Sequence, residues 1–130
     1  MARVFTQADA IRLGLPGRTS LEIVSGRQGA QGLTLRLVEI PPSAAGTLRG
    51  PHHHAAFEEC TFVLAGTGTT VTGTGEYALT PGDTILIPAG EPHVTRNTGT
   101  TPLLLLCFFP VADISPGTNE PSPAREGTAS

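Results

Sequence analysis

The chain has 130 residues and a formal net charge of −3 at pH 7, and charged side chains make up only 15% of it, against about 25% in an average soluble domain. All eight basic residues are arginines, and the absence of lysine excludes Schiff-base chemistry and a phosphate-binding P-loop. The acidic balance and the lack of any run of basic residues argue against nucleic acid as a partner.

The length suffices for one compact hydrophobic core and is too short for two. The longest apolar run, Leu103 to Val111, is too short to span a membrane, and the first residues lack the apolar stretch of a signal peptide. We therefore expect a cytoplasmic, single-domain protein without a membrane partner. Cys60 and Cys107 lie far apart in apolar segments and are interpreted as buried thiols.

The pattern predicts one short N-terminal helix, Thr6 to Leu13, with Thr6 as its cap and Gly14 at its end. The remaining periodicity is that of strands rich in β-branched residues. Eight strands are predicted: Leu21 to Ser25, Leu33 to Ile40, Glu59 to Ala65, Thr69 to Thr72, Glu76 to Leu79, Thr84 to Ile87, His93 to Asn97 and Leu103 to Phe109.

Glycine and proline clusters such as Gly66 to Gly68 and Pro81-Gly82 separate the strands, as in an antiparallel barrel or sandwich. From Ser115 onward the chain has no large apolar residue and cannot bury enough surface to offset its ordering entropy. The expected organisation is one domain over residues 1–114 and a disordered tail over residues 115–130.

Three of the four histidines are consecutive, at positions 52 to 54. On a strand, side chains alternate between faces, so His52 and His54 share one face and His53 points to the other. Glu58 and Glu59 follow, and either could add a carboxylate to the two imidazoles. Such a set suits iron, manganese, nickel, cobalt, zinc or copper, whereas a solvated His-rich loop is the alternative for the three histidines taken alone.

This stretch resembles the first motif of the cupin family, in which Gly, His, His, Glu and Gly follow at fixed intervals. The matching residues are Gly46, His52, His54, Glu59 and Gly66. A second cupin motif matches in the correct order, at Gly82, Pro88, Gly90, His93 and Asn97. The resemblance covers Gly46 to Asn97.

The resemblance implies an all-β fold, a double-stranded β-helix (the cupin jelly-roll barrel), with one divalent transition metal inside. It implies the metal ligands His52, His54, Glu59 and His93. A barrel can bring His93 to the site because its strands lie on opposite walls of one cavity. Four protein ligands would leave one or two coordination positions open for water, oxygen or substrate.

Several neighbouring assignments are less direct. The six-residue interval to Gly66 favours Glu59 over Glu58 as the ligand, and His53 is expected at the surface or behind the ligands. Gly66, Gly82 and Gly90 are interpreted as turn residues able to adopt positive φ. Asn97 is expected to form local hydrogen bonds.

Candidate substrate or supporting residues are Glu58, Arg36, Arg49 and Tyr77. Arg36 lies on a strand otherwise suited to burial and would need an anionic partner there, such as a substrate carboxylate. The favoured interpretation, however, places it outward, beside Glu39 or on an oligomer surface. Phe57 could either cap the cavity or pack in the core.

The fold alone selects no activity, because cupins include oxygenases, decarboxylases, isomerases, lyases and binding proteins. A metal-dependent enzyme acting on a small organic molecule is favoured, with a non-haem oxygenase similar to quercetin dioxygenase ranked slightly first. A redox-neutral isomerase, decarboxylase or cyclase is ranked second, because no spare inward acid or base is evident beyond the ligands. A non-catalytic small-metabolite-binding module is the third hypothesis.

An exposed barrel edge would also allow two copies to pair. Small cupins often form dimers through an extra edge strand or an exchanged N-terminal segment, and Leu21 to Ser25 is the candidate here. We therefore expect a homodimer.

Overall fold

The computed structural model describes residues 1–42, 49–50, 52–54, 56–116, 118–119 and 127–128. Nearly all regular structure in these residues is β-strand, apart from two 3-10 turns, η1 (Gln7–Asp9) and η2 (Gly26–Gln28). The strands are β1 (Ile11–Leu13), β2 (Thr19–Val24), β3 (Thr34–Ile40), β4 (Arg49–Gly50), β5 (His53–His54), β6 (Glu59–Ala65), β7 (Gly68–Thr72), β8 (Gly75–Leu79), β9 (Thr84–Ile87), β10 (His93–Asn97), β11 (Leu103–Phe109), β12 (Thr118–Asn119) and β13 (Gly127–Thr128).

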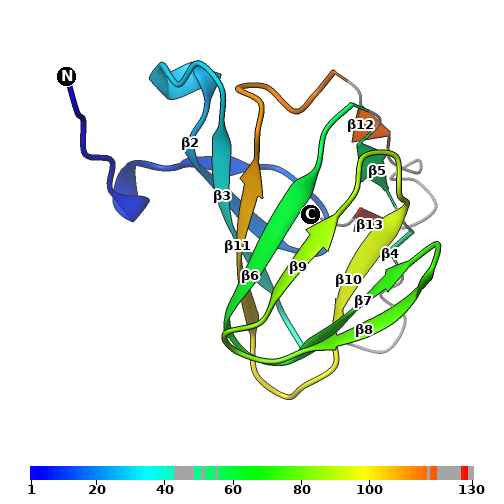
Figure 1. Cartoon of the computed structure of the whole chain (residues 1–130). Coiled ribbons are helices and arrows are strands. Elements are labelled where there is room, and N and C mark those ends of the chain that lie inside the picture. Colours follow the sequence, from blue (N-terminus) through cyan, green and yellow to red (C-terminus); the bar gives the residue numbers. More distant parts are fainter. Residues whose placement is uncertain (43–48, 51, 55, 117, 120–126, 129–130) are drawn as a thin grey trace.

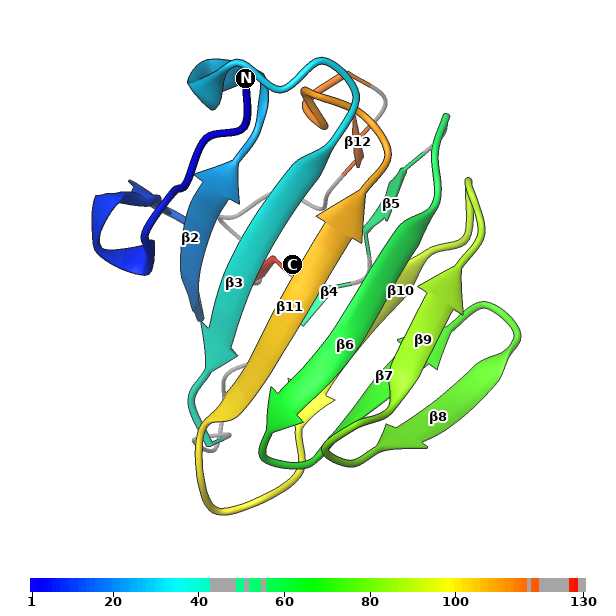
Figure 2. The same ribbon diagram turned by 60° about the vertical axis from the view of Figure 1, so that its left-hand side comes forward.

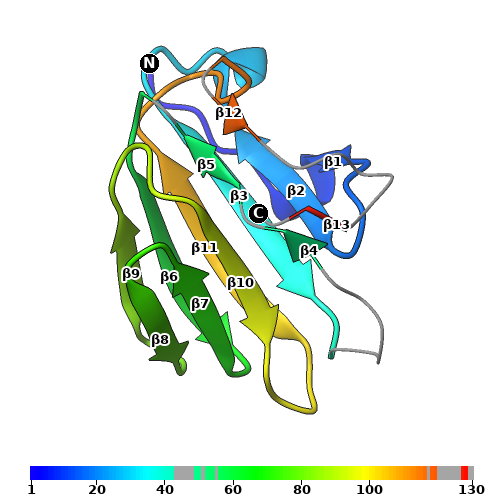
Figure 3. The same cartoon turned by 90° about the vertical axis from the view of Figure 1, so that its right-hand side faces the viewer.

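Two layers of antiparallel strands face each other (Figure 1). The larger sheet has the order β1-β2-β3-β11-β6-β9, and the smaller has the order β10-β7-β8. An isolated bridge between His52 and His93 continues the smaller layer towards β5, which lies beyond β10 in Figure 3. The all-β architecture predicted from the sequence is confirmed.

The bounds of β6, β9, β10 and β11 coincide with the predicted strands, and β2, β3, β7 and β8 differ by one or two residues. Apolar runs bounded by turn residues define these strands well because the turn chemistry marks both ends. The three glycines interpreted as turn residues adopt positive φ, with values of 84° at Gly66, 92° at Gly82 and 83° at Gly90.

The predicted helix from Thr6 to Leu13 is wrong. Only Gln7–Asp9 forms a 3-10 turn, and Ile11–Leu13 is a strand paired with β2. The Thr6 hydroxyl donates to the Asp9 carboxylate, 2.8 Å away, and does not cap a backbone N–H. A helix of this length is only marginally stable in water. The free edge of β2 instead provides hydrogen-bond partners for the backbone of Ile11–Leu13.

The core lies between the two layers and is built mainly from the inward side chains of β3, β6 and β11. On β11 both faces are apolar, so the sequence leaves its orientation open. The structure turns Leu103, Leu105, Cys107 and Phe109 inward, each at most 1% exposed. The alternation in β6 follows the sequence prediction, with Glu59 on the inner face.

Two short pieces of the tail are paired with strands of the domain. Thr118–Asn119 pairs antiparallel with β5, and Gly127–Thr128 pairs in parallel with β4. The disorder expected for the tail stays a prediction for its residues outside the described ranges. Among the described residues, no helix is long and apolar enough to cross a membrane.

The turn glycines provide a matched test of how tightly the turn after β6 approaches the start of the neighbouring strand β11. Gly66 and Gly90 have nearly the same positive φ, but a Cβ on Gly66 would lie 2.5 Å from the Pro102 carbonyl oxygen and 2.8 Å from the Leu103 Cα. A Cβ on Gly90 would meet nothing within 4 Å. Backbone atoms cannot give way as a flexible side chain can.

We predict that Gly90→Ala lowers the free energy of unfolding by about 1–2 kcal/mol, the cost of a left-handed conformation. Gly66→Ala should cost a further 1–3 kcal/mol or so, because overpacking is added to the same backbone strain. Urea unfolding of both variants and the wild type, all free of metal, measures the difference. Equal losses would show that the contact with residues 102–103 adds nothing.

Candidate metal centre

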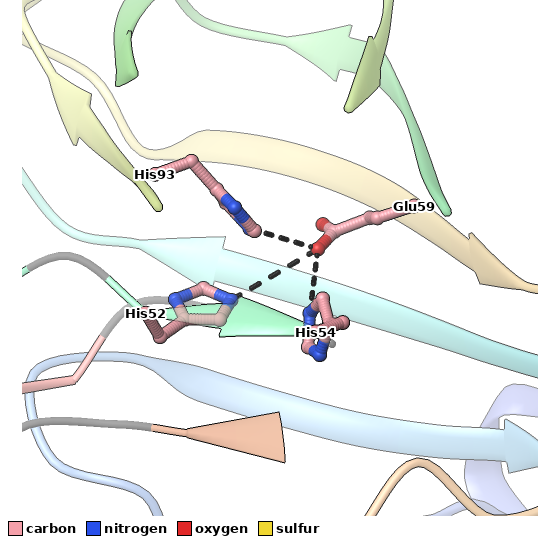
Figure 4. Close-up of side chains that lie close together, drawn as sticks. All are labelled: His52, His54, Glu59 and His93. Atoms are coloured by element: carbon pink, nitrogen blue, oxygen red, sulfur yellow. Dashed lines mark hydrogen bonds and ion pairs between the residues drawn. The ribbon is translucent and has the colours of Figure 1, made fainter. Parts of the chain in front are cut away.

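Four potential ligand side chains gather inside the barrel: His52, His54, Glu59 and His93 (Figure 4). Each is at most 3% exposed. One potential ligand atom from each residue lies within 4.8 Å of all the others. The structure thus brings together the four residues that the two motifs indicated.

A backbone bridge fixes the meeting of the two motifs. The N–H of His52 donates to the His93 carbonyl over 2.9 Å, and the N–H of His93 donates to the His52 carbonyl over 2.7 Å. The two rings face the same interior space, with their centroids 4.0 Å apart. Two histidines distant in sequence are therefore positioned by main-chain hydrogen bonds, which depend little on neighbouring side chains.

Strand alternation selects the inward residues. His52 and His54 are buried, while His53 between them is only half-buried. Glu59 is buried at the start of β6, while Glu58 is exposed. The predicted face of each residue is therefore confirmed, and Glu59 is the glutamate that joins the cluster.

One carboxylate oxygen is the common neighbour of the three imidazoles. Glu59 Oε1 lies 3.0 Å from His93 Nε2, 3.1 Å from His54 Nε2 and 3.9 Å from His52 Nε2. The other oxygen, Oε2, accepts a hydrogen bond of 2.8 Å from the Thr61 hydroxyl. Thr61, two residues along the same strand face, thus holds the carboxylate so that Oε1 points at the three Nε2 atoms.

The outer nitrogens of two rings have oxygen partners that fix their protons. His93 Nδ1 lies 3.0 Å from the Glu91 carbonyl, which can only accept, so this nitrogen carries a proton. His54 Nδ1 lies 2.9 Å from the hydroxyl of Thr118, and that hydroxyl donates to the Ile114 carbonyl. The Thr118 oxygen is therefore left to accept from His54 Nδ1. Both rings can present an unprotonated Nε2 to a metal.

The electrostatics of the cluster favour an ionised carboxylate. Burial alone would raise the pKa of Glu59, but hydrogen bonds from His54 and His93 lower it below its ordinary value. Burial and the charge of His93 lower the pKa of His52 to about 2, so this ring is neutral. For His93, burial acts in the lowering direction, but the hydrogen bond and charge of Glu59 raise its pKa.

An aromatic wall closes one side of the cluster. The Phe57 ring stacks on His54 with centroids 4.8 Å apart, and Phe109 meets His54 edge to face at 5.2 Å. Both phenylalanines are buried. They exclude water from this side and strengthen the polar interactions inside.

The donor set fits a metal ion. Three imidazole nitrogens and one carboxylate oxygen suit divalent transition metals. A metal can replace the proton between His93 Nε2 and Glu59 Oε1. The hydrogen bond from His93 Nδ1 to the Glu91 carbonyl can remain in place. The buried group can therefore bind one metal ion.

Arg36 lies on the inner face of β3, and the expectation that it points outward beside Glu39 is wrong. Its guanidinium forms an ion pair of 3.2 Å with the buried Glu22 of β2, and Ser25 donates to the same carboxylate over 2.8 Å. These residues line a cavity of about 350 Å³ together with Asp113. The anionic partner that a buried Arg36 needs is thus supplied by the chain itself.

Other predicted residues lie away from the cluster. Tyr77 is 44% exposed on β8, where its hydroxyl is 3.2 Å from that of Thr74. Arg49 belongs to β4, but its side chain lies outside the described residues, as does the whole of Gly46. The substrate roles of Arg49 and Tyr77 stay predictions. Asn97 forms the expected local bonds: its amide donates to the Thr101 carbonyl and its side-chain oxygen accepts from the Gly99 N–H. It also donates to the carbonyl of Ile40, which is distant in sequence.

Two polar partners could not be found from the sequence: Thr118 as the partner of His54, and Glu22 as the partner of Arg36. Thr118 comes from a polar tail with no periodicity, and the Glu22 contact depends on the register between β2 and β3. Both contacts depend on strand pairings, β12 with β5 and β2 with β3, whose register cannot be read from either segment alone.

Comparisons with known proteins agree with this geometry. Residues 36–109, more than half of the chain, match the cupin domain family. The polyketide cyclase RemF from Streptomyces resistomycificus is 25% identical, with a TM-score of 0.71, over 92% of this chain and 84% of that chain. Among curated proteins, none matches the chain significantly.

Oxalate decarboxylases share the fold at lower identity. The Lactobacillus farciminis enzyme is 21% identical, with a TM-score of 0.74, over 87% of this chain and 34% of its own. Bacillus subtilis oxalate decarboxylase, which has Mn(II) centers, is 18% identical, with a TM-score of 0.74, over 88% of this chain and 30% of its own. The chain thus spans about a third of the length of these decarboxylases. The family match, the two-layered barrel and the buried histidine and glutamate cluster agree, and the chain belongs to the cupin family.

Proposed function

We propose that this protein is a metal-dependent enzyme that performs a redox-neutral reaction on a small organic molecule. His52, His54, Glu59 and His93 would hold one divalent transition metal. The observation that carries the proposal is the convergence of three buried Nε2 atoms on a single carboxylate oxygen. When bound, the metal supplies Lewis-acid polarisation of a substrate oxygen.

The residues of the chain would orient and protect the reacting group. Thr61 fixes the rotation of the Glu59 carboxylate, and Thr118 fixes the ring of His54. Phe57 and Phe109 keep water from one side of the site. Preorganised ligands in a dry interior need no rearrangement during the reaction, which is a main source of rate enhancement in enzymes.

One observation supports a redox-neutral reaction over the oxygenase that the sequence ranked first. The likeness to the cyclase RemF extends over most of both chains. The cyclase likeness favours a substrate with several carbonyl groups, in which a polarised oxygen acidifies the neighbouring C–H bond.

The test uses the metal-loaded protein and a short β-polyketone thioester as the probe. Proton NMR in D₂O follows exchange of the α-protons and ring closure, while an oxygen electrode follows oxygen uptake. We expect exchange or closure at equal rates with and without oxygen, and loss of both in the chelated protein. A parallel reaction with quercetin checks the oxygenase alternative.

Oxygen consumption in proportion to substrate loss, with either probe, would contradict the redox-neutral proposal and favour the oxygenase. Binding of the probe to metal-loaded protein without any exchange would favour the metabolite-binding module instead.

The ligand set predicts which histidines control the metal content. His52→Ala and His93→Ala should each lower bound metal by at least about tenfold, since even the partners that orient ligands contribute 10–100-fold. His53→Ala should retain the wild-type content, because this residue lies on the other face of the strand. Elemental analysis after metal loading and desalting gives the result. Equal loss in all three variants would contradict the assignment by strand face.

The adjacent glutamates provide a charge-matched pair for the same measurement. Glu59→Gln removes the buried carboxylate that faces the imidazoles, so it should abolish most metal binding. Glu58→Gln removes the same charge from an exposed position and should leave metal binding unchanged. Loss of metal in the Glu58 variant alone would reassign the ligand.

Thr118 should act as a positioning residue for His54. Thr118→Val keeps the shape of the side chain but removes the oxygen that accepts from His54 Nδ1, and we expect metal affinity to fall about 10–100-fold. Thr118→Ser keeps the hydroxyl and should restore most of the affinity. Metal titration of the apo variants measures both. Unchanged affinity in the valine variant would contradict the role.

A further inference from the structure

We propose that the cavity beside Arg36 is a second binding site, separate from the candidate metal centre, for a small zwitterion of the α-amino acid type. The cavity has a volume of about 350 Å³ and lies between the η2 turn and the segment that follows β11. Figure 2 shows both segments at the same end of the barrel. None of the four candidate metal ligands lines the cavity, and the inference does not rest on the proposed function.

The walls of the cavity are fixed by hydrogen bonds. The Gly26 N–H donates to the Ala112 carbonyl over 2.8 Å, which joins η2 to the segment after β11. Ser25 caps η2, because its hydroxyl accepts from the Arg27 N–H over 3.1 Å and its own N–H donates to the Gln28 side chain over 2.8 Å. A preformed site of this kind loses little conformational entropy when a ligand binds.

The floor of the cavity carries a buried ion pair. Glu22 is 5% exposed and accepts a hydrogen bond of 3.2 Å from Arg36 Nη2. A guanidinium has five N–H donors, and Arg36 Nε is buried without a hydrogen-bond partner among the described residues. Arg36 therefore retains donor capacity for a second carboxylate, and such charge-assisted hydrogen bonds are among the strongest polar contacts in proteins.

The rim of the cavity is charged and open to water. The Arg27 side chain is 62% exposed, and Asp113 is also exposed. Hydrogen bonds from Ser115 lower the pKa of Asp113, and the charges of Arg27 and Arg36 act in the same direction, so this carboxylate is ionised at neutral pH. A small polar ligand can thus reach the buried floor past exposed groups of both signs.

The balance of charges selects the class of ligand. The cavity holds two carboxylates, Glu22 and Asp113, and two guanidinium groups, Arg27 and Arg36. A simple anion would compete with Glu22 for Arg36, and a simple cation would compete with Arg36 for Glu22. Either ligand would leave a buried charge poorly compensated, which is costly. A zwitterion adds no net charge, because its carboxylate meets a guanidinium while its ammonium meets a carboxylate.

The size of the cavity agrees with this class, and its position calls for a test that separates it from the metal centre. Its volume falls in the range of roughly 300–1,000 Å³ that is usual for small-molecule sites. The Phe109 ring contacts both sites, with its centroid 5.8 Å from Arg36 Cζ and 5.2 Å from the centroid of His54. Because amino acids can also bind metal ions directly, binding must be measured with and without metal.

The experiment uses the full chain, first freed of metal by chelation and then loaded with metal. The common L-amino acids are screened by melting temperature, which rises when a ligand binds only the folded state. We expect at least one to bind the metal-free chain with a Kd of about 1 mM or lower. In NMR titrations the largest amide shifts should occur at Gly26, Arg27 and Asp113. The deaminated and decarboxylated analogues of that amino acid should bind at least about tenfold more weakly, because each lacks one charged group.

Two exposed rim residues give variants that should fold normally. Asp113→Asn keeps an acceptor for the Ser115 N–H but removes the charge, so the advantage of the amino acid over its deaminated analogue should fall at least about threefold. Arg27→Gln should reduce the advantage over the decarboxylated analogue by a similar factor. As a control, Arg12→Gln removes an exposed charge outside the cavity and should leave the affinity unchanged.

The proposal is overturned if no common L-amino acid binds the metal-free chain. It is also overturned if the deaminated analogue binds as tightly as the amino acid, because the site would then recognise a carboxylate alone. Binding only to the metal-loaded chain, with shifts centred on His54 and His93, would assign the amino acid to the metal centre. That result would contradict the second site without contradicting the proposed function.

Discussion

The interior of this barrel depends on one buried carboxylate. Glu59 is 2% exposed, and a lone ionised group at that depth would cost several kcal/mol. Three imidazoles and the Thr61 hydroxyl compensate this cost, and two of those imidazoles are held by the backbone bridge between the motifs. Removing any of these partners leaves the buried carboxylate less well compensated. The fold and the candidate metal centre are therefore constrained by the same group of atoms.

The two faces of the six-stranded sheet have different chemistry. On the inside, a row of paired residues runs from Glu22 through Arg36 and Cys107 to Thr61, which contacts Glu59. On the outside, the neighbouring row of paired residues is apolar on the four strands β2, β3, β11 and β6. It consists of Leu21, Leu37, Leu106 and Phe62. The central strand β11 contributes to both, which explains why its sequence is apolar on both faces and why its periodicity left the inward side undecided.

Much of this arrangement could be predicted from the sequence. Turn residues bounded the principal strands, and the resemblance of the two motifs to those of the cupin family indicated the four clustered side chains. Strand alternation separately placed His52 and His54 on one face. The helix over Thr6 to Leu13 was wrong because a neighbouring strand edge outweighed a weak local preference. The Glu22 partner of Arg36 and the Thr118 partner of His54 could not be predicted, because each depends on a pairing between segments that share no local signal.

The contact between Thr118 and His54 joins a segment without large apolar residues to the most constrained part of the barrel. Such a segment gains little from hydrophobic burial, so attaching it to the barrel is sensitive to small changes in free energy. Metal occupancy and tail attachment are then reciprocally linked. If the contact of Thr118 with His54 strengthens metal binding, bound metal must strengthen that contact by the same free energy.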